Sequence, residues 1–145
     1  MLEELRQSEV PPLVKQFLRD LGIGALERKA RRQDWKGTTA RRLLATVFAD
    51  TSFYLTRDLL EQKRWNHAAA ALGVATAIRP EDPGPWYNLA CAYSSMGRVD
   101  DAVEALAKAC ASGRLRRELP ENDPDLEAVR DHPGYRRLVE SLSPP

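Results

Sequence analysis

Residues 83–114 have the pattern of two short antiparallel helices, and this pattern limits the folds available to the whole chain. Four residues recur at helical spacing and share one face of the first helix: Trp86, Leu89, Ala90 and Tyr93. Gly97 then provides a turn, and three residues line one face of the second helix: Ala102, Leu106 and Ala109. Large side chains on the first helix meet small ones on the second, so the two backbones pack closely. Because one hairpin cannot bury its own apolar face, the sequence predicts further helices beside it.

The pattern resembles the tetratricopeptide repeat, a two-helix unit with a period of about 34 residues. One period upstream, a second copy keeps four of the apolar positions: Leu55, Ala68, Leu72 and Ala75. Four other positions depart from the family pattern: Ser52, Thr56, Leu59 and Lys63. The resemblance covers roughly half of the chain and implies two repeats, a degenerate one at about 49–82 and a clear one at about 83–116.

The N-terminal part is also expected to be helical. A stripe of apolar residues indicates a helix at 12–21, and 25–36 has the character of a basic helix that ends before Gly37. Residues 39–62 contain neither Pro nor Gly and predict one long helix. Its second half serves as the first helix of the degenerate repeat, so it must pack on two sets of neighbours.

The C-terminal segment is expected to close the array. Asp123 with Pro124, and His132 with Pro133, each indicate the start of a short helix. The sequence DPDLEAVRDHPGYRRL is similar to the tail that closes many bacterial tetratricopeptide arrays. The similarity implies a cap that covers the open face of the last repeat.

These segments predict one all-α domain over residues 1–145, built from antiparallel helical hairpins of the tetratricopeptide type that form an α-α superhelix. Its expected parts are N-terminal helices (1–48), two repeats (49–116) and capping helices (117–145). We expect about six to eight helices and no sheet.

The composition favours a cytoplasmic protein. Hydrophobic residues make up 43% and charged residues 30% of the sequence, with a net charge of +1, values that are typical of soluble globular proteins. No apolar run approaches the roughly 20 residues of a membrane-spanning helix. The first residues, MLEELRQSEV, carry acids where a secretory signal has a basic start and an apolar core.

Residues 24–42 form a strongly basic segment, with seven Lys or Arg against two acids and Trp35 among them. Cations around an aromatic ring suit binding to nucleic acid or to anionic lipid. The alternative is a solvated helix face, on which Arg side chains cover apolar surface and Trp35 anchors the helix to the core.

The sequence contains no recognisable catalytic or metal-binding motif. Its two histidines, His67 and His132, lie far from each other and from the two cysteines, Cys91 and Cys110. Zinc and nucleophile motifs place such residues at short fixed spacings, which this sequence lacks. We therefore expect a non-enzymatic protein without metal or cofactor, whose cysteines are reduced thiols that pack as small apolar side chains.

The resemblance implies an interaction module that binds a partner protein or peptide on the concave face of the repeats. In this family the first helix of each repeat lines that face, and the corresponding positions are Phe53, Tyr54, Arg57, Tyr87, Asn88 and Cys91. Asn88 stands where the family often binds a peptide backbone or a terminal carboxylate. Phe53 and Arg57 stand where chaperone-binding members have a Lys and an Asn, so binding to chaperone C-termini is not expected.

Three alternatives remain open. In the first, the protein is a structural subunit or assembly factor that uses its flat faces and N-terminal helices. In the second, the basic segment 24–42 contacts nucleic acid or an anionic membrane. In the third, residues 12–36 fold back and fill the short groove, and Phe53 and Tyr54 then belong to the core.

Overall fold

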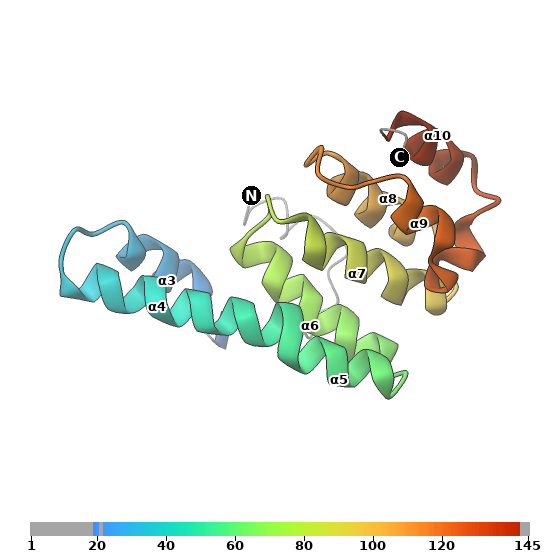
Figure 1. Cartoon of the computed structure of the whole chain (residues 1–145). Helices are drawn as coiled ribbons and strands as arrows, with labels where there is room; N and C mark the ends of the chain where they lie inside the picture. The colour runs from blue at the N-terminus through green and yellow to red at the C-terminus, as the bar shows by residue number, and fades with distance from the viewer. Residues whose placement is uncertain (1–18, 21, 143–145) are drawn as a thin grey trace.

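The computed structural model describes residues 19–20 and 22–142, and every regular element in that part of the chain is helical (Figure 1). The elements are α3 (Ile23–Ala30), α4 (Trp35–Ala49), the π-helical turn η1 (Asp50–Tyr54), α5 (Leu55–Glu61), α6 (Trp65–Ile78), α7 (Pro83–Ser95), α8 (Val99–Cys110), α9 (Glu118–Asn122), the 3-10 helix η2 (Pro124–Val129) and α10 (Pro133–Ser141). The all-α prediction is confirmed. The helix predicted at 12–21 lies almost entirely outside the described residues.

The helix predicted at 39–62 is present and longer than expected. α4, η1 and α5 follow one another without a break, so a single helical rod runs through residues 35–61 (Figure 1). Its middle and C-terminal end pack against α6, and α3 packs back against α4 in its N-terminal half.

The basic helix predicted at 25–36 is wrong in its extent. α3 ends at Ala30, and a turn at 31–34 separates it from α4. The Asp34 carboxylate accepts a hydrogen bond from the Gly37 N–H at 3.0 Å and so caps α4. Arg41 Nη1 donates to the Ala30 and Arg32 carbonyl oxygens at 2.6 and 3.1 Å, which supplies the end of α3 with a cationic cap.

Two smaller expectations at this turn are also corrected. Gly37 does not break the chain but lies buried in the first turn of α4. Trp35 does not anchor the segment to the core, since 72% of its surface is exposed.

Gly37→Ala is expected to destabilise the turn between α3 and α4. An added methyl group would clash with the Arg32 carbonyl oxygen, which is backbone and cannot swing away. We expect a loss of about 1–3 kcal/mol, the usual cost of overpacking. Urea unfolding checks this, and Gly84→Ala is the control because its methyl group would meet only the Asp82 side chain. Equal stability of the two variants would contradict the described turn.

Two helical hairpins follow, and each turns through a residue in the left-handed region. Gly97 has a φ of 72° between α7 and α8, and Lys63 has a φ of 55° between α5 and α6. Lys63 thus adopts the backbone conformation that glycine adopts in the clear repeat, at the cost of some steric strain. This explains why the first repeat forms the same hairpin although its turn residue departs from the family pattern.

Small residues let α6, α7 and α8 pack closely. Ten alanines of these helices are buried: Ala68, Ala69, Ala71, Ala75, Ala77, Ala90, Ala92, Ala102, Ala105 and Ala109. Leu72 and Leu106 fill the space between the helices and are fully buried. The core therefore lies along α6–α8, between the long rod and the C-terminal elements.

The C-terminal elements cover the open side of the second hairpin. η2 packs against α7 and α8, and α10 packs against α8. Leu126 and Val129 are fully buried there, and the Tyr135 hydroxyl donates to the Pro120 carbonyl oxygen at 2.8 Å. Asp123 and His132 cap the two helix starts, as the sequence predicts.

Candidate functional site

Phe53 and Tyr54 form an aromatic pair on the surface of the long rod. Their ring centroids lie 5.4 Å apart with the ring planes at 87°, an edge-to-face arrangement. The side chains are 59% and 58% exposed, and Leu55 beside them is 49% exposed. Three consecutive large apolar residues thus face away from the protein's own core, which is uncommon for single domains and typical of interaction surfaces.

The π-helical turn at Asp50–Tyr54 is the local structure that displays this pair. Thr51 Oγ1 donates to the Val47 carbonyl oxygen at 2.7 Å, and buried Thr56 Oγ1 donates to the Thr51 carbonyl oxygen at 2.6 Å. Hydroxyl groups therefore bond carbonyl oxygens at both ends of the irregular turn. The wider π-helical turn rotates the residues that follow it relative to α4. Turns of this kind often occur at functional sites.

Thr56→Val is expected to lower the free energy of unfolding by about 1–3 kcal/mol, since it leaves the buried Thr51 carbonyl without its hydroxyl partner. Thermal unfolding followed by circular dichroism measures the effect. Thr46→Val is the matched control: its hydroxyl also bonds a carbonyl, that of Arg42 at 3.1 Å, but it is exposed to water. If both variants unfold alike, the Thr56 hydroxyl does not hold the turn.

Arg57 lies one turn after the aromatic pair and is exposed. Its guanidinium lies 3.3 Å from Asp58 and 3.9 Å from Glu61, and all three side chains are more than half exposed. Exposed pairs of this kind contribute at most about 1 kcal/mol. Arg57 is therefore free to exchange its neighbours for a carboxylate or carbonyl of a partner.

Tyr87 and Cys91 lie in a different environment, beneath the C-terminal elements. The Tyr87 hydroxyl donates to the Asp123 carboxylate at 2.7 Å, and the Cys91 thiol lies 3.7 Å from the same oxygen. Both residues are buried. Burial first, and then the Asp123 carboxylate, raises the pKa of Tyr87 and of Cys91. Cys91 is thus a protonated thiol at neutral pH, not a nucleophile, and the pair fastens η2 to α7.

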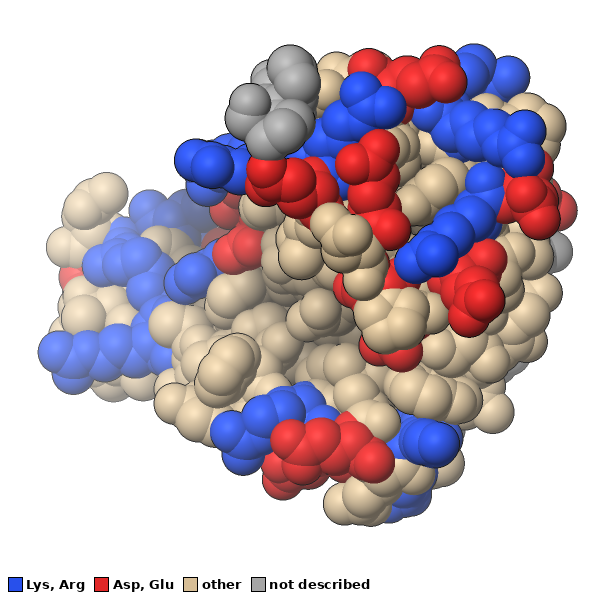
Figure 2. Space-filling model, turned by 45° about the vertical axis from the view of Figure 1, so that its right-hand side comes forward, with Lys and Arg blue, Asp and Glu red and all other residues tan. Residues whose placement is uncertain are grey.

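Asn88 is half-buried on α7, and its side-chain amide makes no hydrogen bond to any described residue. η1 and α7 both pack against α6, so the aromatic pair on η1 and Asn88 on α7 are carried by neighbouring layers. Figure 2 shows a hollowed face of uncharged side chains, bordered above and below by Lys, Arg, Asp and Glu. Of the predicted site residues, Phe53 contacts Tyr54, and Tyr87 and Cys91 meet at Asp123. No direct contact joins these two pairs among the described residues.

Comparison with known families decides the class of these hairpins. Residues 59–116 match the family model of the tetratricopeptide repeat. This segment belongs to the tetratricopeptide repeat family. No curated protein and no solved structure matches the chain significantly. Tetratricopeptide repeats act in general as protein-interaction modules, so the matched segment indicates this broad class of function but not the partner.

The tetratricopeptide match begins at residue 59, after the aromatic pair. Phe53 and Tyr54 therefore lie on the long rod outside the matched residues. One feature of the sequence does indicate this exposed surface. Three consecutive residues of a helix span about 200° around its axis, which is wider than the apolar stripe that a surface helix buries. The run Phe53–Tyr54–Leu55 therefore cannot be buried on one side of the rod.

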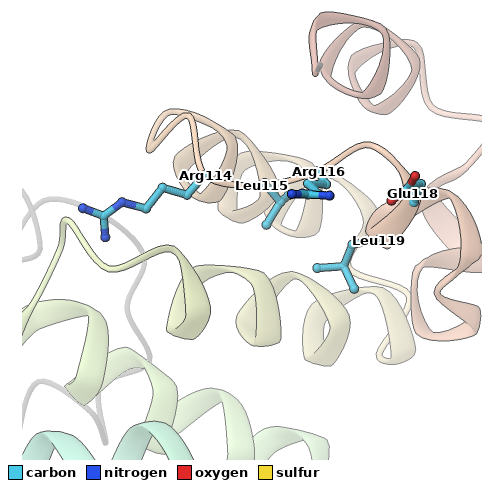
Figure 3. Close-up of a pocket in the computed structure, with 5 residues that line it drawn as sticks. All are labelled: Arg114, Leu115, Arg116, Glu118 and Leu119. Atoms are coloured by element: carbon cyan, nitrogen blue, oxygen red, sulfur yellow. The ribbon is translucent and has the colours of Figure 1, made fainter. Parts of the chain in front are cut away.

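A shallow pocket of about 500 Å³ lies where the chain passes from α8 to α9, and the sequence does not single it out. Figure 3 shows Leu115 and Leu119 pointing toward α7, while the Arg114 side chain extends away from them. Arg116 and Glu118 complete the lining. The pocket has an apolar floor and charged edges.

None of the described helices is both long and apolar enough to cross a membrane. No group of three or more His, Cys, Asp or Glu within the described part of the chain is placed to hold a metal ion.

Proposed function

We propose that the protein is a non-enzymatic adaptor, which binds a segment of a partner protein on the face that carries Phe53, Tyr54 and Arg57. The observation that carries the proposal is the exposed edge-to-face pair of Phe53 and Tyr54 beside Leu55. Aromatic residues are enriched among the few that dominate binding energy at protein interfaces. Rigid backbone on both sides holds the pair in place before binding, which lowers the entropy cost of association.

The charges around the pair indicate the chemistry of the partner segment. Arg57 offers donors to a carboxylate or a backbone carbonyl, and the Asn88 amide on α7 offers both a donor and an acceptor. A segment with an apolar anchor and an acidic residue about one helical turn away fits these groups. In this proposal Tyr87 and Cys91 act indirectly, because their bonds to Asp123 fix the position of α7.

The proposal places this binding in the cytoplasm. Cys91 and Cys110 are free thiols, which suits a reducing compartment. No step of bond making or breaking is part of the proposed role.

The test is affinity capture with the full chain and two double variants. Phe53→Ala with Tyr54→Ala is expected to lose the partners that the wild type captures, since each hot-spot aromatic contributes about 2 kcal/mol or more. The control, Leu43→Ala with Leu119→Ala, removes two exposed leucines from other places on the surface and should retain them. Quantitative mass spectrometry gives, for each captured protein, the ratio of the amount bound by the variant to the amount bound by the wild type.

The proposal fails if both double variants capture the same proteins as the wild type. Circular dichroism of all three chains must show unchanged helix content, so that a lost partner reports a lost surface and not a lost fold.

A further inference from the structure

The hairpin of α3 and the start of α4 carries a cluster of cations that the proposed function does not use. Five of them are exposed and form no ion pair with any residue of the described chain: Arg28, Lys29, Arg31, Lys36 and Arg42. We call residues 28–42 the basic tip. Apart from Asp34 within the tip, the acid nearest in sequence is Glu27, which is half-buried; its pKa is raised because burial outweighs the opposing effect of Arg31 and Arg28.

Two other arginines hold the tip in shape. Arg32 binds Asp34 through its Nε and Nη2 atoms at 2.9 and 2.6 Å, and Arg41 bonds the carbonyl oxygens of Ala30 and Arg32. The Arg32 guanidinium, with the Gly37 N–H, lowers the pKa of Asp34 to about 2, so Asp34 stays ionised and cancels the charge of Arg32. The five exposed cations are thus surplus charge on a fixed scaffold.

The basic tip also stands away from the rest of the protein. α3 packs chiefly against α4, and the contacts of α4 with α6 are made farther along the rod (Figure 1). Figure 2 shows Lys and Arg gathered on this protruding end. Trp35 lies at the start of α4 with 72% of its surface exposed, and the Lys36 ammonium lies 5.6 Å from its ring centroid.

We infer that the basic tip binds the surface of a membrane that contains anionic lipid. Clusters of four to eight cations on a helix attract the anionic headgroups of the cytoplasmic leaflet. Tryptophan prefers the boundary between headgroups and acyl chains, where its ring is partly buried and its N–H stays hydrated. Exposed cations around one exposed Trp on a protruding turn match this boundary layer.

The same features favour a lipid surface over nucleic acid. Sequence-independent binding of a single strand uses a groove that follows the backbone and open aromatic faces on which bases stack. The basic tip is the protruding end of a helical hairpin (Figure 1), and the Lys36 ammonium already lies over the Trp35 ring. A flat anionic surface needs neither a groove nor a free ring face.

The test measures binding of the full chain to vesicles by co-sedimentation. Vesicles of phosphatidylcholine mixed with phosphatidylserine, an anionic lipid of the cytoplasmic leaflet, are compared with vesicles of phosphatidylcholine alone. The tip variant is Arg28→Gln, Lys29→Gln, Arg31→Gln and Arg42→Gln. The matched control removes four exposed arginines elsewhere: Arg64→Gln, Arg114→Gln, Arg116→Gln and Arg137→Gln.

We expect the wild type and the control to bind the anionic vesicles and the tip variant to bind at least about tenfold more weakly, since each cation near such a surface contributes roughly fivefold. Binding should fall steeply when salt rises, because screening shortens the reach of the charges. Absent binding of the wild type, equal binding to both vesicles, or an equal loss in the control variant would overturn the inference.

Tryptophan fluorescence provides a second measurement, which reports the environment of Trp35 and does not respond to a general loss of charge. Transfer of Trp35 to the lipid boundary should shift the emission to shorter wavelength, and Trp35→Phe should abolish the shift while Trp65 and Trp86 still report the folded protein. A shift that persists in Trp35→Phe would contradict the assignment. Saturable submicromolar binding to a single-stranded oligonucleotide, without vesicle binding, would assign the tip to nucleic acid instead.

Discussion

Leu126→Ala is expected to lower the free energy of unfolding by about 2–5 kcal/mol, as a large side chain lost from a filled core does. Leu126 is fully buried on η2, where it joins the cluster formed by α7 and α8. The hydrogen bond from Tyr87 to Asp123 fixes η2 nearby, so the site cannot collapse easily around the missing atoms. Marginal stability makes such a loss a large part of the total.

Urea unfolding measures this effect, and Leu119→Ala is its matched control. Leu119 belongs to the same C-terminal region, but about half of its surface is exposed. Its truncation should change the free energy of unfolding by less than about 0.5–1 kcal/mol. If Leu126→Ala were as stable as Leu119→Ala, the C-terminal elements would be an appendage rather than a cap on the second repeat.

Trp86→Ala is expected to cost about 3–5 kcal/mol. The Trp86 ring packs against the core cluster, its Nε1 donates to the Pro80 carbonyl oxygen at 2.9 Å, and the Lys108 ammonium lies 4.5 Å from the ring. Trp86 thus ties together the loop before α7, α7 itself and α8. The substitution removes apolar contact, a hydrogen bond and a cation–π contact at once.

Trp35→Ala makes the same chemical change on the surface and serves as the control for Trp86→Ala. Trp35 is 72% exposed, so we expect a change of no more than about 0.5 kcal/mol. A denaturation midpoint that is the same for both Trp variants would show that Trp86 has no role in the second repeat.

The helices of the repeats follow from the sequence because their signals are local. Small and large apolar residues recur at helical spacing, and the cap residues Asp82 and Asp123 stand directly before proline. The turn at 31–34 gives a weaker signal. Basic residues favour helix on their own, and the break depends on Arg41 reaching back across nine to eleven residues.

The site is less accessible to sequence reasoning, for a physical reason. Helical spacing places Tyr87 and Cys91 on the face predicted for a partner, but it cannot show that Asp123 arrives there from 36 residues away. The π-helical turn is likewise invisible in spacing alone, since a single π-helical turn within an α-helix changes the apolar spacing too little to be recognised. Phe53, Tyr54 and Arg57 are the predicted residues that the structure leaves exposed.

Photo-crosslinking from the aromatic pair is the most direct measurement of the proposed binding face. A benzophenone amino acid in place of Tyr54 keeps an aromatic ring at the site, and the same amino acid in place of exposed Leu43 or Leu119 serves as the control. We predict that a captured partner crosslinks from position 54 and that Phe53→Ala weakens this product. Crosslinking of the same partner from position 43 or 119, with none from position 54, would place the binding face elsewhere.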